Sequence, residues 1–173
     1  MAITINGNGT ITGYTPTTIS GTLSKSNLPA GTILQTVRVN TSSSQQISNN
    51  STWTDTALTL NITPEFSNSL IFLTLYCRWG NDTSASNGLR LIKDSTTVVD
   101  GNSNFLHNVA YNVNTNRPVE DGAYAFFDTA GGTSAINYKI QCRVTNGHFT
   151  FNGRGGETND PKTCYLIAQE IKA

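Results

Sequence analysis

Apolar and polar residues alternate with a period of two along much of the chain after residue 31. The clearest stretch is 136–144, where the apolar positions are Ile136, Tyr138, Ile140, Cys142 and Val144. Such a period places the apolar side chains on one face of a half-buried β-strand. Shorter stretches at 58–62, 89–93, 148–151 and 164–171 predict further strands. No stretch shows a sustained period of 3.6 residues, so the pattern favours an all-β protein.

Two segments are apolar on both faces. In 70–79, one face carries Ile71, Leu73, Leu75, Cys77 and Trp79, and the other carries Leu70, Phe72 and Tyr76. The aromatic segment 123–127 is similar. A strand of this kind faces a core on one side and a second covering surface on the other. We therefore expect contacts between subunits, with these candidate residues: Phe72, Tyr76, Tyr124 and Phe126.

Turn-forming residues separate the predicted strands. Asp94-Ser95 predicts a hairpin between 89–93 and 96–99, and Gly131-Gly132 a second turn. Residues 41–51 read as a polar loop, and 100–122 as long loops with one weak strand near 105–113. About eight short strands divided by turns predict an antiparallel jelly-roll β-sandwich.

The first 30 residues differ from the rest, because they contain little that could form a core. Asn6-Gly7-Asn8-Gly9 favours a tight turn, and Pro16 and Pro29 interrupt regular structure. We expect an extended N-terminal arm at 1–30 and the sandwich at 31–173. Such an arm becomes ordered by docking on a partner, through these candidate anchor residues: Ile3, Ile5, Ile11 and Tyr14.

Charge excludes two classes of partner. The chain has 11 Lys and Arg against 11 Asp and Glu, and only 13% of its residues are charged. A nucleic-acid binder needs a basic surface to neutralise phosphates, and a polybasic membrane-surface protein needs one for anionic lipids. No apolar run approaches the ~20 residues of a spanning helix. The first residues also lack the basic and apolar regions of a signal peptide.

The residues give little sign of catalysis or of a bound metal or cofactor. Glu120 and Asp121 are adjacent, so on a strand they would point to opposite faces, and no G-x-S-x-G turn occurs. His107 and His148 stand alone. Residues 100–104 resemble the start of a calcium loop, but Phe105 takes the place of the required glycine. We therefore expect no enzyme and no EF-hand, while a looser calcium site stays open.

Three cysteines, Cys77, Cys142 and Cys164, lie within apolar runs. An odd number without a secretion signal does not indicate a disulfide framework. We expect buried, reduced packing residues, with a Cys77–Cys142 bridge as the alternative.

Aromatic and amide residues in the predicted loops suggest a sugar site. A ring face together with amide hydrogen bonds is a common way to hold a saccharide. The candidate glycan-contact residues are Trp53, Tyr111, Asn112 and Asn114, to which Asn116 could add a further amide. The alternative is that Trp53 packs in the core or between subunits.

The order of segments resembles a domain of marine and cyanobacterial phage structural proteins. The segments are GTILQTV at 31–37, LTLNITP at 58–64, NSLIFLTL at 68–75, LRLIKD at 89–94, FFD at 126–128, YKIQCRV at 138–144 and AQEI at 168–171. The opening ITINGNGTITG at 3–13 is similar to the N-terminus of many phage fibre proteins. The resemblance implies a trimeric jelly roll, shaped like tumour-necrosis-factor heads, on a virion surface.

The resulting hypothesis is a non-enzymatic phage virion protein made in the host cytoplasm. It would be a homotrimeric short fibre or capsid-decoration protein, anchored to other capsid or tail proteins by its arm, and able to contact host glycans. The alternatives are the receptor-binding tip of a tail fibre, a glycan-degrading tailspike enzyme, and a free sugar- or peptide-binding module of cellular origin.

Overall fold

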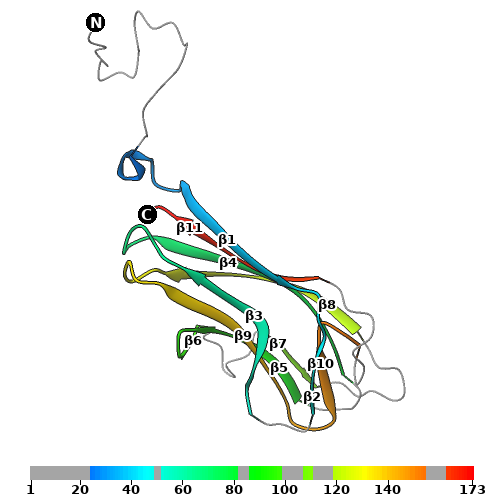
Figure 1. The fold of residues 1–173 in the computed structure, drawn as a ribbon. Coiled ribbons are helices and arrows are strands. Elements are labelled where there is room, and N and C mark those ends of the chain that lie inside the picture. Colours follow the sequence, from blue (N-terminus) through cyan, green and yellow to red (C-terminus); the bar gives the residue numbers. More distant parts are fainter. Residues whose placement is uncertain (1–23, 49–51, 82–85, 99–106, 111–118, 155–162) are drawn as a thin grey trace, which may run out of the picture.

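The computed structural model describes residues 24–48, 52–81, 86–98, 107–110, 119–154 and 163–173. Within these ranges it contains one short 3-10 helix, η1 (Lys25–Asn27), and no α-helix. All other regular structure is β-strand, packed in two layers (Figure 1).

Two antiparallel sheets form the layers. The first sheet consists of β1 (Ile33–Thr41), β2 (Gln45–Ser48), β4 (Leu70–Asn81), β8 (Val119–Thr129), β10 (His148–Phe151) and β11 (Cys164–Ile171). The second sheet consists of β3 (Thr54–Ile62), β5 (Ser86–Lys93), β6 (Thr96–Thr97), β7 (His107–Ala110) and β9 (Ile136–Val144).

The strand pairs are nested along the chain. β1 pairs with β11, β3 with β9, β4 with β8, and β5 with β7, all antiparallel. The first and the last of these strands in the sequence therefore pair with each other. Each further pair is formed by strands that lie, in the sequence, between the two strands of the pair before it. An eight-stranded sandwich with this wrapping is a jelly roll, so the predicted fold class is confirmed.

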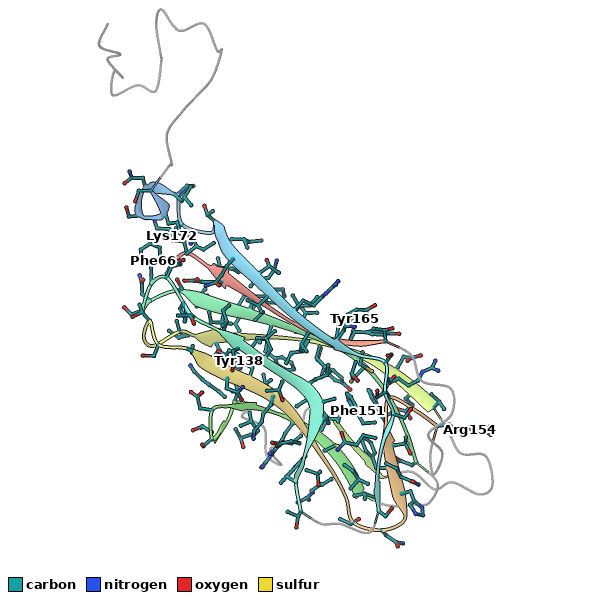
Figure 2. The ribbon with its side chains drawn as sticks, in the orientation of Figure 1. Phe66, Tyr138, Phe151, Arg154, Tyr165 and Lys172 are labelled. Carbon is teal, nitrogen blue, oxygen red and sulfur yellow. The ribbon has the colours of Figure 1, made fainter. Side chains whose placement is uncertain are left out.

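The core lies between the two sheets and comes from the alternating positions. In β9 the burial alternates through all nine residues, and in β11 through all eight. Figure 2 shows Tyr138 and Phe151 between the layers, whereas Tyr165 lies on the outer side of the first sheet. The largest fully buried side chains include Tyr138, Phe149, Phe151, Leu58, Ile71, Leu73, Leu75, Leu91, Ile140 and Leu166.

Most predicted strands are present, but several differ in extent. β3 begins at Thr54 and not at 58, and β5 begins at Ser86 and not at 89. The polar loop predicted at 41–51 was wrong in part, because residues 45–48 form β2 against β10 and bury Ile47. β8 begins at Val119, earlier than the segment 123–128, because it pairs with β4 along its whole length. The weak strand near 105–113 is β7, and the Asp94-Ser95 hairpin joins β5 to β6.

The three cysteines are buried and unbonded, as predicted. Cys77, Cys142 and Cys164 are all free thiols, so the alternative Cys77–Cys142 bridge is not formed. Burial raises the pKa of each of the three thiols. A protonated, buried thiol is a poor nucleophile, so these residues serve packing.

Gly122 in β8 is tightly enclosed by the indole of Trp79. A Cβ atom at this position would lie 2.4 Å from Trp79 Cη2 and 2.6 Å from Trp79 Cζ3. Trp79 is itself buried, so its ring has little room to retreat. Gly122→Ala should therefore lower the free energy of unfolding by about 1–3 kcal/mol.

Urea unfolding at pH 7 measures this loss, and Gly132→Ala is the matched control. A Cβ at Gly132 would meet nothing within 4 Å, so that variant should stay close to the wild type. Equal midpoints for the two variants would show that the Trp79 contact does not constrain β8.

Candidate functional site

The outer face of the second sheet carries the one predicted ligand residue that the structure describes. Trp53 immediately precedes β3, and its ring centroid lies 4.4 Å from Cζ of Arg90 in β5 and 5.1 Å from Cζ of Arg143 in β9. These distances are those of cation–π contacts. The other predicted glycan-contact residues, Tyr111, Asn112 and Asn114, lie outside the described residues.

A chain of polar contacts continues from this cluster across the sheet. Arg90 Nε donates to Gln141 Oε1 at 2.7 Å, and Gln141 Nε2 donates to Asp55 Oδ1 at 2.5 Å. Lys139 Nζ lies 2.8 Å from Asp55 Oδ2. Hydrogen bonds from Lys139 and Gln141 lower the pKa of Asp55, so its carboxylate is charged at neutral pH. We call the outer surface of β3, β5 and β9 the polar face.

The outer surface of the first sheet has the opposite character. The four large apolar side chains that are exposed in the described residues all belong to its strands: Ile33 in β1, Leu70 and Tyr76 in β4, and Phe127 in β8. Their exposed fractions are 52%, 38%, 39% and 66%. We call the outer surface of β1, β11, β4 and β8 the apolar face.

Strand register places the large apolar side chains of this face in neighbouring rows. One row across the sheet brings Ile33, Ile171 and Leu70 together. The next brings Phe72 beside Phe127, with ring centroids 4.7 Å apart. After a row that contains Ile167, Thr74 and Ala125, a fourth row places Tyr165, Tyr76 and Ala123 side by side.

Charge on the apolar face is confined to its margins. Arg38 projects from the edge strand β1, with its guanidinium 5.8 Å from the centre of the Tyr165 ring. Arg78 and Asp121 form a two-pronged ion pair at the far end of β4 and β8, with N···O distances of 3.0 and 3.1 Å. An apolar centre with a charged margin is typical of a protein–protein interface.

The predicted subunit-contact residues divide between the two sides of the first sheet. Phe72 and Tyr76 are on the apolar face, whereas Tyr124 and Phe126 are partly buried against the core. The outward residues of β8 include Ala123, Ala125 and Phe127. Phe127 is therefore the exposed aromatic residue of this strand, and the alternation in 123–128 allowed either set of positions to face outward.

The described end of the predicted arm, residues 24–30, is attached to one end of the sandwich. Lys172 Nζ donates to the carbonyl oxygens of Ser26, at 2.7 Å, and Leu28, and Lys25 forms an ion pair with Glu65. Figure 2 shows Lys172 beside Phe66, whose ring centre is 5.9 Å from Lys172 Nζ. The predicted anchor residues Ile3, Ile5, Ile11 and Tyr14 lie outside the described residues.

The polar cluster lies at the other end of β3 from this attachment. Trp53 precedes the first residue of β3, and Glu65 follows the last. Nine residues of strand separate the two ends by about 30 Å. The part of the polar face around Trp53 is therefore well separated from the point at which the N-terminal segment joins the sandwich (Figure 1).

The described residues contain neither a cluster of metal-binding side chains nor a membrane-spanning helix. No group of three or more His, Cys, Asp and Glu side chains gathers there to hold a metal ion. None of the described helices is long and apolar enough to cross a membrane. The predicted loose calcium segment, 100–104, lies outside the described residues.

Comparisons with known proteins find similar structures but no related sequence. No family model matches the chain, and no curated protein does. Among solved structures, the chain is similar to a protein in the structure of infectious bursal disease virus, Gx strain, with 11% identity and a TM-score of 0.43. It is also similar to the VP2 subviral particle of that virus, with 13% identity and a TM-score of 0.39. Each match covers 80% of this chain and 37% of the other.

Proposed function

We propose that the protein is a non-enzymatic phage virion protein that assembles as a homotrimer of jelly rolls. In this assembly, a short fibre or a capsid decoration, the apolar face of each copy packs against its neighbours. The observation that carries the proposal is that apolar face, which gathers the exposed large apolar side chains of the described chain on one sheet.

The size of the apolar face fits a second copy of the chain. Four strands about 4.8 Å apart and about 30 Å long give this sheet face roughly 570 Å², polar side chains included. Stable interfaces cover about 800 Å² on each partner, so this face would supply most of one. The near absence of charge at its centre suits burial, because an unpaired charge is costly to remove from water.

Threefold assembly follows from the family resemblance in the sequence, and it would serve adsorption. Three copies display three polar faces together, and linked weak sites gain roughly 10²–10⁴ in avidity without any new contact. The low content of charged residues leaves few surface ion pairs for salt to screen.

Two measurements on the full chain test the proposal. Light scattering after size exclusion should give three times the 18.6 kDa of one chain, and an antibody raised against the protein should label intact phage particles. A monomer at micromolar concentration would overturn the trimer, and unlabelled particles would overturn the virion assignment.

Deleting residues 1–23 should abolish incorporation into particles while leaving a folded trimer. The deletion stops before Lys25, because residues 25–28 contact Lys172 and Glu65 in the sandwich. Circular dichroism and light scattering check the fold and the trimer, and western blotting of purified particles checks incorporation. Normal incorporation of the truncated chain would remove the role of the arm as an anchor.

A further inference from the structure

Two of the three buried thiols, Cys77 and Cys164, lie opposite each other on neighbouring strands of the first sheet. β4 and β11 are antiparallel, and their register pairs Tyr76 with Tyr165. The next step of this register brings Cys77, in β4, opposite Cys164, the first residue of β11. Both side chains are fully buried, so both point from the same face of the sheet into the core.

Hydrogen bonds of Arg78 show which kind of cross-strand pair the two cysteines form. The backbone N–H of Arg78 donates to Cys164 Sγ at 3.4 Å, and the Arg78 carbonyl oxygen accepts from Asn152 N at 2.7 Å. Both groups therefore point to the side of β4 that carries β10 and β11, opposite β8. Since these directions alternate along a strand, the backbone groups of Cys77 point towards β8. Cys77 and Cys164 are thus a non-hydrogen-bonded pair, whose Cα atoms lie about 4.5 Å apart.

This spacing suits a disulfide between β4 and β11. Disulfides join Cα atoms that are about 4.4–6.8 Å apart. The third thiol, Cys142, belongs to the opposite sheet, and sheets that pack face to face are about 10 Å apart. Burial raises the pKa of Cys77, and Cys164 raises that pKa more than Cys142 does. Cys164 is therefore the better placed partner for Cys77.

We propose that Cys77 and Cys164 form an oxidation site, at which a disulfide links β4 to β11 when the protein meets an oxidising environment. In the reduced protein the two thiols pack in the core, and the bridge adds a covalent bond to that same contact. The inference goes beyond the proposed function, and it depends neither on the trimer nor on the virion assignment.

The reaction is an exchange with a low-molecular-weight disulfide, RSSR. Cys164 is at the first residue of β11, so local opening of the strand end exposes it first. Its thiolate attacks one sulfur of RSSR, which forms a mixed disulfide and releases one RS⁻. The Cys77 thiolate then attacks Cys164 Sγ, which forms the bridge and releases the second RS⁻. The two protons that the cysteines lose convert both RS⁻ to RSH, so two thiols are oxidised and one RSSR is reduced.

Intact mass spectrometry of the full chain tests the site. The probe is 2-hydroxyethyl disulfide, which is small and uncharged, and the protein is afterwards denatured and alkylated. The product should be lighter by about 2 Da before alkylation, and it should take up one label where the reduced protein takes up three. Because burial raises the pKa of both thiols, the product should form faster at about pH 9 than at about pH 7.

Peptide maps and alanine variants locate the bridge. A map made without reductant should join the peptides that contain Cys77 and Cys164, and it decides the pairing in the wild type alone. Cys77→Ala and Cys164→Ala should each keep their full mass, whereas Cys142→Ala should lose about 2 Da like the wild type. The bridged protein should unfold roughly 5–15 °C above the same protein after reduction, because the link restricts the unfolded chain.

Three outcomes would overturn the inference. In the first, all three thiols of the folded wild type remain open to alkylation after prolonged incubation at about pH 9. In the second, a mixed disulfide persists and no bridge forms. In the third, the bridge includes Cys142. Light scattering on the untreated protein measures the trimer separately, so failure of this site is distinguishable from failure of the proposed assembly.

Discussion

Glu170→Ala is expected to lower the free energy of unfolding by about 3 kcal/mol. Glu170 lies on the inner side of β11 and is fully buried. Its Oε1 accepts hydrogen bonds from Ser69 Oγ at 2.7 Å and from the backbone N–H groups of Glu65 and Phe66, and its Oε2 accepts from Gln35 Nε2. Alanine would remove this acceptor from all four donors, although Gln35 Nε2 keeps a second one in the Thr63 carbonyl oxygen. A buried donor without a partner costs about 1–3 kcal/mol.

The measurement is thermal and urea unfolding at pH 7, with Glu170→Gln as the matched control. For a chain of this length, 3 kcal/mol corresponds to a fall in Tm of roughly 6–12 °C. Glutamine keeps the shape and one acceptor oxygen, so Glu170→Gln should lower the free energy of unfolding by less than Glu170→Ala. If the alanine variant unfolds at the wild-type midpoint, Glu170 does not hold segment 63–69 against β1 and β11.

The contribution of Glu170 should also depend on pH. Burial raises the pKa of this carboxyl, but its hydrogen bonds outweigh burial and leave the pKa below its ordinary value. The unfolded chain therefore takes up the proton first as the pH falls. The stabilisation is fully present above the unfolded pKa of about 4.3, and it is lost as the pH drops through the lower, folded value.

Urea unfolding of the wild type and Glu170→Gln at several pH values tests this dependence. The difference in unfolding free energy should be constant between pH 6 and 8 and should shrink below about pH 4. A difference that grows on acidification would have the wrong sign for a carboxylate with a lowered pKa.

The sequence predicted best the strands in which apolar and polar residues alternate throughout. β9 and β11 have the predicted bounds for this reason, and β10 also has them, although three of its four residues are buried. β2 was missed because Ile47 is its only apolar residue, and pairing with β10 supplies the rest of its stability. The first residues of β8, Glu120 to Gly122, are weak strand formers that β4 holds in register.

The two candidate surfaces were predictable to different degrees. The apolar face was indicated by Phe72 and Tyr76, which share the outward parity of β4. Trp53 was identified alone, because Arg90 and Arg143 reach it only through the register of β3, β9 and β5. The burial of Glu170 could also have been predicted from the sequence, because it has the same parity in β11 as the buried Cys164, Leu166 and Ala168.

Phe127→Lys is expected to convert the proposed trimer to a monomer. In a single protomer the ring of Phe127 is 66% exposed and contacts Phe72, so lysine there should cost a lone subunit little. In the trimer the same position would bury an ammonium group against a neighbour's apolar surface. The effective penalty for such burial is several kcal/mol per ion, and threefold symmetry repeats it at every interface.

Thr59→Lys provides the matched control, because Thr59 is an exposed strand residue on the polar face of the other sheet. Light scattering at equal protein concentration should give a monomer for Phe127→Lys and a trimer for both Thr59→Lys and the wild type. Circular dichroism should show the same β-sheet spectrum in all three proteins, which separates dissociation from unfolding. A Phe127→Lys protein that remains trimeric would place the contact between copies on another surface.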